Sequence, residues 1–295
     1  MRPALLALVA LAACATAPAP VPTDPAAALA DSVEALVAEY PAATVAVVLD
    51  APGLGYRRNA DRPFHAASTM KVPVMIEAFR QVGATERAWD DSVLVENRFR
   101  SIVDGSEYAI EDDTDDALYT LLGQRLPLRN LVERAITTSS NLATNLLIQE
   151  VSAEAVQATV DRLGAPGMRV LRGVEDLKAF EAGLSNETTA QALATLLVAL
   201  RDGAAVSPEA DAAMLDVLDD QAFTEMIPAG VPAGTRVANK TGWITEIHHD
   251  AAVVFPPDAD PYVLVILTEG LADREASAAL GAAISRAVWD AVTAL

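Results

Sequence analysis

Two of the three lysines in this chain lie where a serine nucleophile would need an amine. Lys71 closes a Ser-x-x-Lys motif that begins at Ser68, and Lys240 opens a Lys-Thr-Gly triplet. The other 18 of the 21 basic residues are arginines. A buried lysine amine can lose its proton, whereas a guanidinium stays charged. A lysine one helical turn after a serine can therefore act as the base that takes the proton of the hydroxyl group.

The residues around Ser68 predict that it lies at the N-terminus of a helix. The apolar residues after it recur at the spacing of one helical face: Val72, Met75, Ile76 and Phe79. Pro73 falls in the first turns, where a missing N–H costs least. The free N–H groups of a helix start favour negative charge, and the N–H of Ser68 can form half of an oxyanion hole. We also expect burial beside Lys240 to lower the pKa of Lys71 through desolvation and like-charge repulsion.

Apolar patterning predicts a sheet that is built from both ends of the chain around a helical middle. Strands are expected at residues 44–50, 55–59, 237–240, 250–255 and 262–268, and helices at about 25–39, 188–200 and 274–292. Residues 86–205 are interpreted as mostly helical, with two short helices in 128–151 that meet at 137–140. The expected fold class is α/β (α+β): an antiparallel sheet flanked by helices, with an all-α domain inserted. The acidic cluster is interpreted as a solvated loop; its members are Asp112, Asp113, Asp115 and Asp116.

Two further motifs strengthen the Ser-x-x-Lys signal, which is weak alone. Ser139-Ser140-Asn141 follows on a helix-entry loop, and Lys-Thr-Gly follows beside a strand. Ser-x-x-Lys, Ser-x-Asn and Lys-Thr-Gly, in this order, are the set found in penicillin-interacting serine enzymes. The chain therefore resembles the class A serine β-lactamases and their penicillin-binding-protein relatives over about residues 25–295. The flanking segments resemble that family too: residues 64–67, 141–147, 186–189 and 249–251.

The resemblance implies a role for each remaining motif residue. Ser139 would pass a proton to the leaving nitrogen, and Asn141 would orient the side-chain amide of the substrate. Lys240 and Thr241 would bind the substrate carboxylate, and the backbone N–H of Trp243 would complete the oxyanion hole. Taken singly, these residues have plainer interpretations: a helix cap for Ser139, a loop-stabilising amide for Asn141 and a surface cation for Lys240.

The hydrolytic step is less well marked in the sequence. The resemblance implies a loop glutamate, followed four residues later by an asparagine, that activates the attacking water. Glu175 falls at the expected interval between Ser139 and Lys240, but position 179 is Ala179. Glu175 could equally pair with Lys178 or with an arginine on a loop surface, so both interpretations stand here.

Two other departures from the family pattern bear on substrate range more than on acylation. Ser140 stands where the family has an aspartate between the serine and the asparagine. Trp243 and Ile244 are bulky where the family usually has small residues.

Composition and motif content exclude several other classes of function. The net charge of -20, from 41 acidic and 21 basic residues, argues against binding of nucleic acid or of anionic membranes. The three histidines, His65, His248 and His249, do not have the spacing of a zinc site. No Gly-x-Ser-x-Gly elbow of an α/β-hydrolase occurs. We therefore expect neither a metal nor a cofactor.

The N-terminal segment is interpreted as an export signal. Arg2 precedes an apolar run at residues 4–13, which is too short to span a bilayer and ends in small residues. The segment before Cys14, the chain's one cysteine, resembles a bacterial lipobox, so we expect Cys14 to be lipidated; an ordinary signal peptide is the alternative. The expected organisation is a signal at 1–13, the lipidated cysteine and linker at 14–24, and a catalytic domain at 25–295. Within that domain, 25–65 and 215–295 would form the α/β part and 66–214 the helical part.

These features predict an exported serine hydrolase that opens β-lactam rings through an acyl intermediate on Ser68. One alternative is a penicillin-binding or D-alanyl peptidase-like enzyme that acts on peptidoglycan stems. Another is a non-catalytic cell-envelope protein with the same fold. The expected partner is a small β-lactam or a stem peptide, with no nucleic acid and with membrane contact only through the lipid anchor. The expected location is the periplasm or cell envelope, and the expected state is a monomer.

Overall fold

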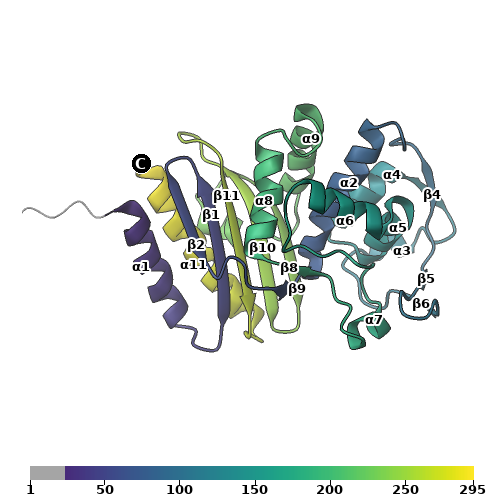
Figure 1. The fold of residues 1–295 in the computed structure, drawn as a ribbon, viewed down its shortest axis with the longest axis horizontal. Coiled ribbons are helices and arrows are strands. Elements are labelled where there is room, and N and C mark those ends of the chain that lie inside the picture. Colours follow the sequence, from purple (N-terminus) through teal and green to yellow (C-terminus); the bar gives the residue numbers. More distant parts are fainter. Residues whose placement is uncertain (1–23) are drawn as a thin grey trace, which may run out of the picture.

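The computed structural model describes residues 24–295 and contains a five-stranded antiparallel sheet with helices on both faces (Figure 1). The strands are β1 (Thr44–Ala51), β2 (Leu54–Arg58), β9 (Arg236–Ile244), β10 (Ile247–Phe255) and β11 (Tyr262–Glu269). Their order in the sheet is β2-β1-β11-β10-β9. Strands from both ends of the chain therefore pair within one sheet, which confirms the predicted fold class.

Both faces of the sheet are covered, and this explains why the central strands β1 and β11 contain long apolar runs. Residues 45–49 of β1 are all fully buried. Alternate side chains pack with α1 (Pro25–Ala38) and α11 (Arg274–Thr293) on one face and with most of the other helices on the opposite face. A strand with only one buried face would alternate apolar and polar residues. Figure 1 shows α1 and α11 together on one side of the sheet.

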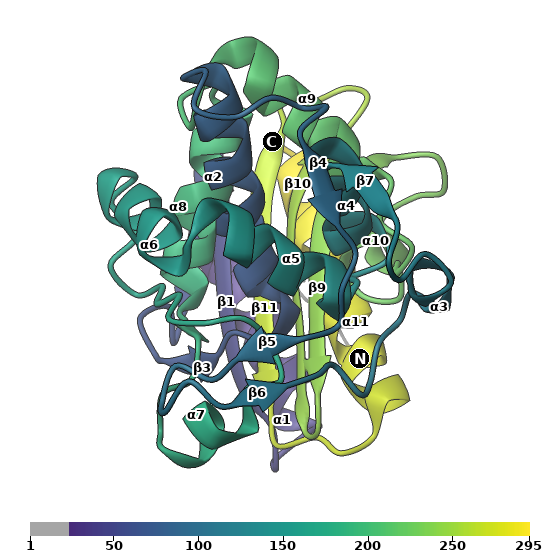
Figure 2. The same ribbon diagram turned by 90° about the vertical axis from the view of Figure 1, so that its right-hand side faces the viewer.

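The short helix α10 (Ile227–Gly230) packs with α1 and α11. The opposite face carries the helices that hold the candidate site: α2 (Lys71–Gly83), α3 (Asp116–Tyr119), α4 (Leu128–Thr137), α5 (Asn141–Val151), α6 (Ala153–Arg162), α7 (Leu177–Glu181), α8 (Ala190–Arg201) and α9 (Pro208–Asp219). In Figure 2 this side faces the viewer, with α2 and α5 in front of the sheet. The two predicted helices that meet at residues 137–140 are confirmed as α4 and α5.

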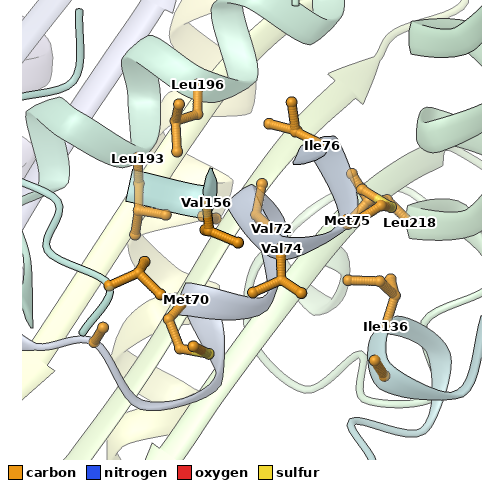
Figure 3. Close-up of a cluster of buried hydrophobic side chains, with 14 of the residues drawn as sticks. Met70, Val72, Val74, Met75, Ile76, Ile136, Val156, Leu193, Leu196 and Leu218 are labelled. Atoms are coloured by element: carbon orange, nitrogen blue, oxygen red, sulfur yellow. The ribbon is translucent and has the colours of Figure 1, made fainter. Parts of the chain in front are cut away.

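Helix α2 is buried along most of its length, which fixes the position of its N-terminus. Residues 71–78 are all buried. Figure 3 shows apolar side chains of α2 among side chains from four other helices, including Ile136 of α4, Val156 of α6, Leu193 of α8 and Leu218 of α9. Each fully buried aliphatic side chain contributes about 1.5–3 kcal/mol relative to its exposed state. This burial fixes the position of Lys71, the first residue of α2.

The prediction that residues 86–205 are mostly helical is wrong for the stretch between α2 and α4. That stretch contains turns, α3 and short strand pairs: β4 (Ser92–Leu94) with β7 (Arg125–Pro127), and β5 (Phe99–Arg100) with β6 (Glu107–Tyr108). In β4 buried and exposed positions alternate, which is the period of a strand rather than of a helix. A further two-residue pair joins β3 (Phe64–His65) to β8 (Glu187–Thr188).

The predicted signal segment and Cys14 lie outside the described residues, as does all of the linker except Asp24. Across residues 24–295, no helix has both the length and the apolar character that crossing a bilayer requires. Among the same residues, histidine, cysteine, aspartate and glutamate side chains nowhere gather in threes to form a metal-binding group.

Candidate active site

Ser68 lies in a 3-10 turn, η1 (Ala67–Met70), that runs directly into α2. Its side chain is half-buried, and Ala67 before it has a φ of 45°. A positive φ is strained for a residue other than glycine, and such strain concentrates at functional sites. Strand β9 packs against this turn so closely that a Cβ on Gly242 would lie 3.0 Å from the nitrogen of Ser68. The glycine of the Lys-Thr-Gly triplet is therefore required for the approach of β9 to the Ser68 backbone.

Lys71 is fully buried, and its amine makes three polar contacts. Nζ donates to the carbonyl oxygen of Ser139 at 2.6 Å, to Oδ1 of Asn141 at 2.9 Å and to Oγ of Ser139 at 3.2 Å. Burial lowers the pKa of Lys71 to about 7, while the negative charges of Asp113 and Glu175 oppose that shift. The lowered pKa and its desolvation cause are those expected from the sequence, whereas repulsion by Lys240 is not among the causes of this shift. Near neutral pH a substantial fraction of this amine is uncharged and can accept a proton.

The hydroxyl of Ser139 lies between two lysine amines. Besides the contact with Lys71, its Oγ accepts a hydrogen bond from Nζ of Lys240 at 3.1 Å. Lys240 also donates to the carbonyl of Thr241 at 2.9 Å and is fully buried, so the surface-cation interpretation is wrong. Burial and the charge of Lys71 hold the pKa of Lys240 well below its ordinary value. The charge of Asp250 opposes that shift, and an anionic group bound beside Lys240 would oppose it further.

Asn141 connects the lysine to the glutamate. Its Oδ1 accepts from Lys71, and its Nδ2 donates to Oε1 of Glu175 at 2.9 Å. Oε2 of Glu175 accepts from the N–H of Glu111 at 2.9 Å. Lys178 pairs with Asp104 at 2.8 Å instead, so the predicted alternative of a Glu175–Lys178 pair is wrong. The structure therefore brings Glu175 to the same cluster as Lys71, Ser139 and Asn141.

Two of these residues have strained backbones: Ser139 has a φ of 59°, and so does Glu175. Ser139 does not cap a helix, because the N-cap of α5 is Ser140, whose Oγ accepts from the N–H of Ala143 at 3.2 Å. Left-handed geometry in non-glycine residues costs about 1–3 kcal/mol each and persists only where the surroundings fix it. Here it turns both side chains into one cluster.

The loop before Glu175 is held by Asn145, to which no sequence motif assigns a role. Oδ1 of Asn145 accepts from the N–H of Val174 at 2.7 Å, and Nδ2 donates to the carbonyl of Val174 at 3.0 Å. A Cβ on Gly173 would lie 2.4 Å from Oδ1 of Asn145, so this pairing requires glycine. Ala179 is fully buried in α7, where its N–H donates to Asp176. The distance of Gly173 and Asn145 from the motifs along the chain does not indicate, in a single sequence, that the two residues pair.

Trp243 lies at the exposed edge of the site. Its side chain is 49% exposed, and the guanidinium of Arg274 lies 5.3 Å from its ring centroid. Thr241, two residues earlier on β9, is buried. The ring is therefore partly covered by Arg274, and Trp243 directly follows the buried Lys-Thr-Gly triplet on β9.

The close packing of β9 on η1 gives a direct test of the oxyanion arrangement. A Gly242→Ala substitution is expected to slow acylation of Ser68 by about 10–100-fold, because its methyl group pushes β9 away from the Ser68 nitrogen. Gly55→Ala on β2 is the matched control, since its Cβ would meet no atom closer than 3.7 Å. Acylation rates of both variants with a β-lactam would be compared by stopped-flow. Equal rates for the Gly242→Ala variant and the wild type would contradict this arrangement.

Comparison with known proteins agrees with the geometry. The model of the beta-lactamase enzyme family matches residues 28–292. A beta-lactamase of Bacillus amyloliquefaciens is 32% identical over 148 residues, which cover 49% of this chain and 48% of that protein. One from Streptomyces lavendulae is 31% identical over 151 residues, which cover 50% of each. The chain spans about half the length of the curated relatives it matches.

Solved structures share the fold over nearly their whole length. A beta-lactamase from Sphaerobacter thermophilus superposes with a TM-score of 0.77 at 31% identity, covering 91% of this chain and 98% of that one. PBP-A superposes with a TM-score of 0.79 at 24% identity, covering 90% and 96%. At that identity the second similarity shows the fold alone.

Proposed function

We propose, from the premise that the chain belongs to the beta-lactamase enzyme family, that it is a serine hydrolase that opens β-lactam rings through an acyl intermediate on Ser68. The observation that carries this proposal is the buried amine of Lys71. It lies one turn after Ser68, its pKa is lowered to about 7, and it is held by Ser139 and Asn141. Such an amine supplies the base that a serine hydroxyl needs.

In the proposed acylation step, Oγ of Ser68 attacks the β-lactam carbonyl carbon and Lys71 takes the hydroxyl proton. The N–H groups of Ser68 and Trp243 stabilise the oxyanion. The ring C–N bond then breaks, and Ser139 gives its hydroxyl proton to the departing nitrogen. Ser139 recovers a proton from one of the two lysine amines that contact its Oγ. The ring opens, and the acyl group stays on Ser68.

In the proposed deacylation step, Glu175 takes a proton from a water molecule that attacks the ester carbonyl. The carboxylate is held by Asn141 and by the N–H of Glu111, on the same cluster as Lys71. Collapse of the tetrahedral intermediate releases the opened product and returns the proton to Ser68.

A second candidate function has its own support. Ala179 leaves this loop without the asparagine that the family uses beside its glutamate, which favours slow release of the acyl group. PBP-A, a variant of which is described as an acyl-enzyme complex with penicillin G, shares the fold. The second candidate is therefore a penicillin-binding or D-alanyl peptidase-like enzyme that acts on peptidoglycan stems.

The test is to mix the purified protein with penicillin G and with a chromogenic cephalosporin. Turnover, intact mass and the modified peptide are followed together. The β-lactamase proposal expects multiple turnovers and a transient adduct of intact penicillin mass on the peptide that contains Ser68. A stable adduct without turnover would support the second candidate. Absence of any adduct with β-lactams or depsipeptides would overturn both and favour a non-catalytic protein.

We further propose that residues 1–13 direct export and that Cys14 carries a lipid that anchors the protein in the cell envelope. Because Cys14 is the one cysteine in the chain, Cys14→Ser removes the only thiol that could carry a lipid. The wild type is expected to incorporate labelled palmitate in a bacterial host and to fractionate with membranes, whereas the variant does neither. Equal labelling of both proteins would contradict the lipid anchor.

A further inference from the structure

The segment that precedes α3 is not the solvated loop that its acidic residues suggested. Residues 111–115, here called the acidic segment, contact the Ser139 loop and Glu175. Asp113 is half-buried and Asp115 is buried. Arg134 of α4 donates twice to the carboxylate of Asp115, at 2.8 and 2.7 Å, and so fixes the end of the segment. Charge alone does not distinguish a solvated loop from one whose carboxylates accept backbone N–H groups.

Resting on the proposed function, we propose that Asp113 is a positioning residue for acylation: its carboxylate holds the Ser139-Ser140-Asn141 loop from outside that loop. Ser140 occupies the position where the family has an aspartate. This chain therefore supplies the missing carboxylate from a different element. Asp113 itself does not touch the reacting atoms; it acts through Asn141 and Ser139.

The carboxylate of Asp113 accepts five hydrogen bonds, divided between its two oxygens. Oδ1 accepts from the N–H of Asn141 at 2.9 Å and of Thr114 at 2.7 Å. Oδ2 accepts from the N–H of Leu142 at 2.8 Å, Oγ of Ser140 at 3.2 Å and the hydroxyl of Tyr119 at 3.1 Å. Three of the donors belong to the start of α5, which carries Asn141 into the site.

The need for this carboxylate follows from helix geometry. The first N–H groups of a helix have no acceptor within the helix. Oγ of Ser140 satisfies only one of them, the N–H of Ala143. The N–H groups of Asn141 and Leu142 are satisfied by Asp113 instead, and a negative charge there is favoured by the helix dipole. A serine in the family's aspartate position is thus compensated by a second residue.

The rest of the acidic segment reinforces the same geometry. Oγ1 of Thr114 donates to the carbonyl of Thr138, next to Ser139. The carbonyl of Asp112 accepts from Nδ2 of Asn141 at 3.0 Å. The N–H of Glu111 donates to Glu175. One segment therefore holds both the loop that serves acylation and the glutamate proposed for deacylation.

Asp113 also acts on Lys71 through its charge. The negative charges of Asp113 and Glu175 raise the pKa of Lys71 against the effect of burial, and the charge of Lys71 in turn lowers the pKa of Lys240. Removal of the Asp113 charge should lower the pKa of Lys71 further. The acidic limb of the acylation profile would then move to lower pH, a change that loosened packing alone would not produce.

The first experiment compares Asp113→Asn with Asp116→Asn. The substituted amide at position 113 would place an NH₂ group against a backbone N–H, because both carboxylate oxygens accept from such groups. Acylation by penicillin G is expected to fall about 100-fold in the first variant. The Asp116 control, an exposed residue just beyond the acidic segment, should stay within about 2-fold. Equal, small effects in both variants would overturn the proposal.

The second experiment moves the carboxylate back to the family position. Asp113→Ser and Ser140→Asp are each expected to slow acylation, the second because two carboxylates would lie where Oγ and Oδ2 are now 3.2 Å apart. The double variant should recover to within about 10-fold of the wild type, since aspartate is also a good N-cap. If the decreases in acylation rate of the two single variants simply combine in the double variant, the proposal is overturned. Melting curves identify variants that fail to fold.

The third experiment does not depend on activity. The chain has three lysines, so selective ¹³Cε labelling gives one NMR signal each for Lys71, Lys178 and Lys240. The midpoint of Lys71 is expected to move about 0.5–1 pH unit lower in Asp113→Asn and to stay in place in Asp116→Asn. An unmoved midpoint would overturn the positioning role even if the wild type acylates. If the wild type forms no adduct, the proposed function fails while this titration still tests the role of Asp113.

Discussion

A Lys71→Met variant is expected to acylate Ser68 about 10³–10⁴ times more slowly than the wild type. Methionine fills much of the same buried volume but has no basic nitrogen, and a positioned general base contributes about 10²–10⁴ in rate. The amine is placed for the task because Ser139 and Asn141 hold it one turn from Ser68. Burst-phase mass spectrometry with penicillin G measures the acylation rate. Ser68→Ala, which has no nucleophile at this position, gives the background signal.

Lys71→Arg separates a base from a structural cation. Arginine keeps the positive charge and the hydrogen-bond donors but does not deprotonate. If Lys71 acts as the base, the arginine variant loses as much rate as the methionine variant. An arginine variant with a rate near that of the wild type would show that only the charge matters.

The pH dependence of this step follows from the pKa of Lys71, which burial lowers to about 7. Acylation requires the neutral amine, so its rate should rise with pH through about 7 and then level off.

The free energy of unfolding should also increase with pH because of Lys71. Between about 7 and 10.5 the unfolded chain binds more protons at this lysine than the folded protein, so stability increases with pH in that window. Removing Lys71 should therefore raise the melting temperature by a constant amount below about pH 7 and by less as the pH rises from about 7 to 10.5.

The amino-acid sequence predicts those parts of the fold that local physics determines. The helix after Ser68 has a clear helical period, and the central strands are continuous apolar runs of strand length, so their positions follow from single segments. The stretch between α2 and α4 differs from the prediction because its strands are only two or three residues long. Their partners lie between 7 residues away (Arg100 and Glu107) and 35 residues away (Ser92 and Pro127) in the chain. Patterns that short carry little information about a partner so distant in the chain.

The candidate site likewise contains residues that the sequence motifs identify and residues that only the folded structure identifies. Ser68, Lys71 and Lys240 are recognisable because each lies in an ordered motif, and the structure brings the two lysine amines to the hydroxyl of Ser139. Asn145 and Asp113 are not, because each acts by accepting or donating to backbone groups of a loop that meets it only in the folded chain. A carboxylate in an acidic stretch has the same sequence appearance whether it is solvated or caps a helix.

The fate of the acyl group depends on Glu175. A Glu175→Gln variant is expected to acylate within about 10-fold of the wild type and to deacylate at least about 10³-fold more slowly, because an amide does not take a proton from water. The side chain keeps its size, but its NH₂ group will face a donor, either Nδ2 of Asn141 or the N–H of Glu111, so one of the two contacts is lost. The loss of that contact is the reason to expect a small decrease in the acylation rate.

The measurement is intact mass after a brief mix with penicillin G, followed over hours. The variant should carry a lasting adduct on Ser68 while the wild type returns to its free mass, and Glu181→Gln, an exposed position on α7, should behave as the wild type. Unchanged turnover in Glu175→Gln would mean that another base activates the attacking water.

A wild type that itself retains the adduct would point to Ala179 as the reason for slow deacylation. In that case Ala179→Asn, which introduces a polar amide into a fully buried position beside this loop, is the variant that should gain turnover if the missing asparagine limits hydrolysis.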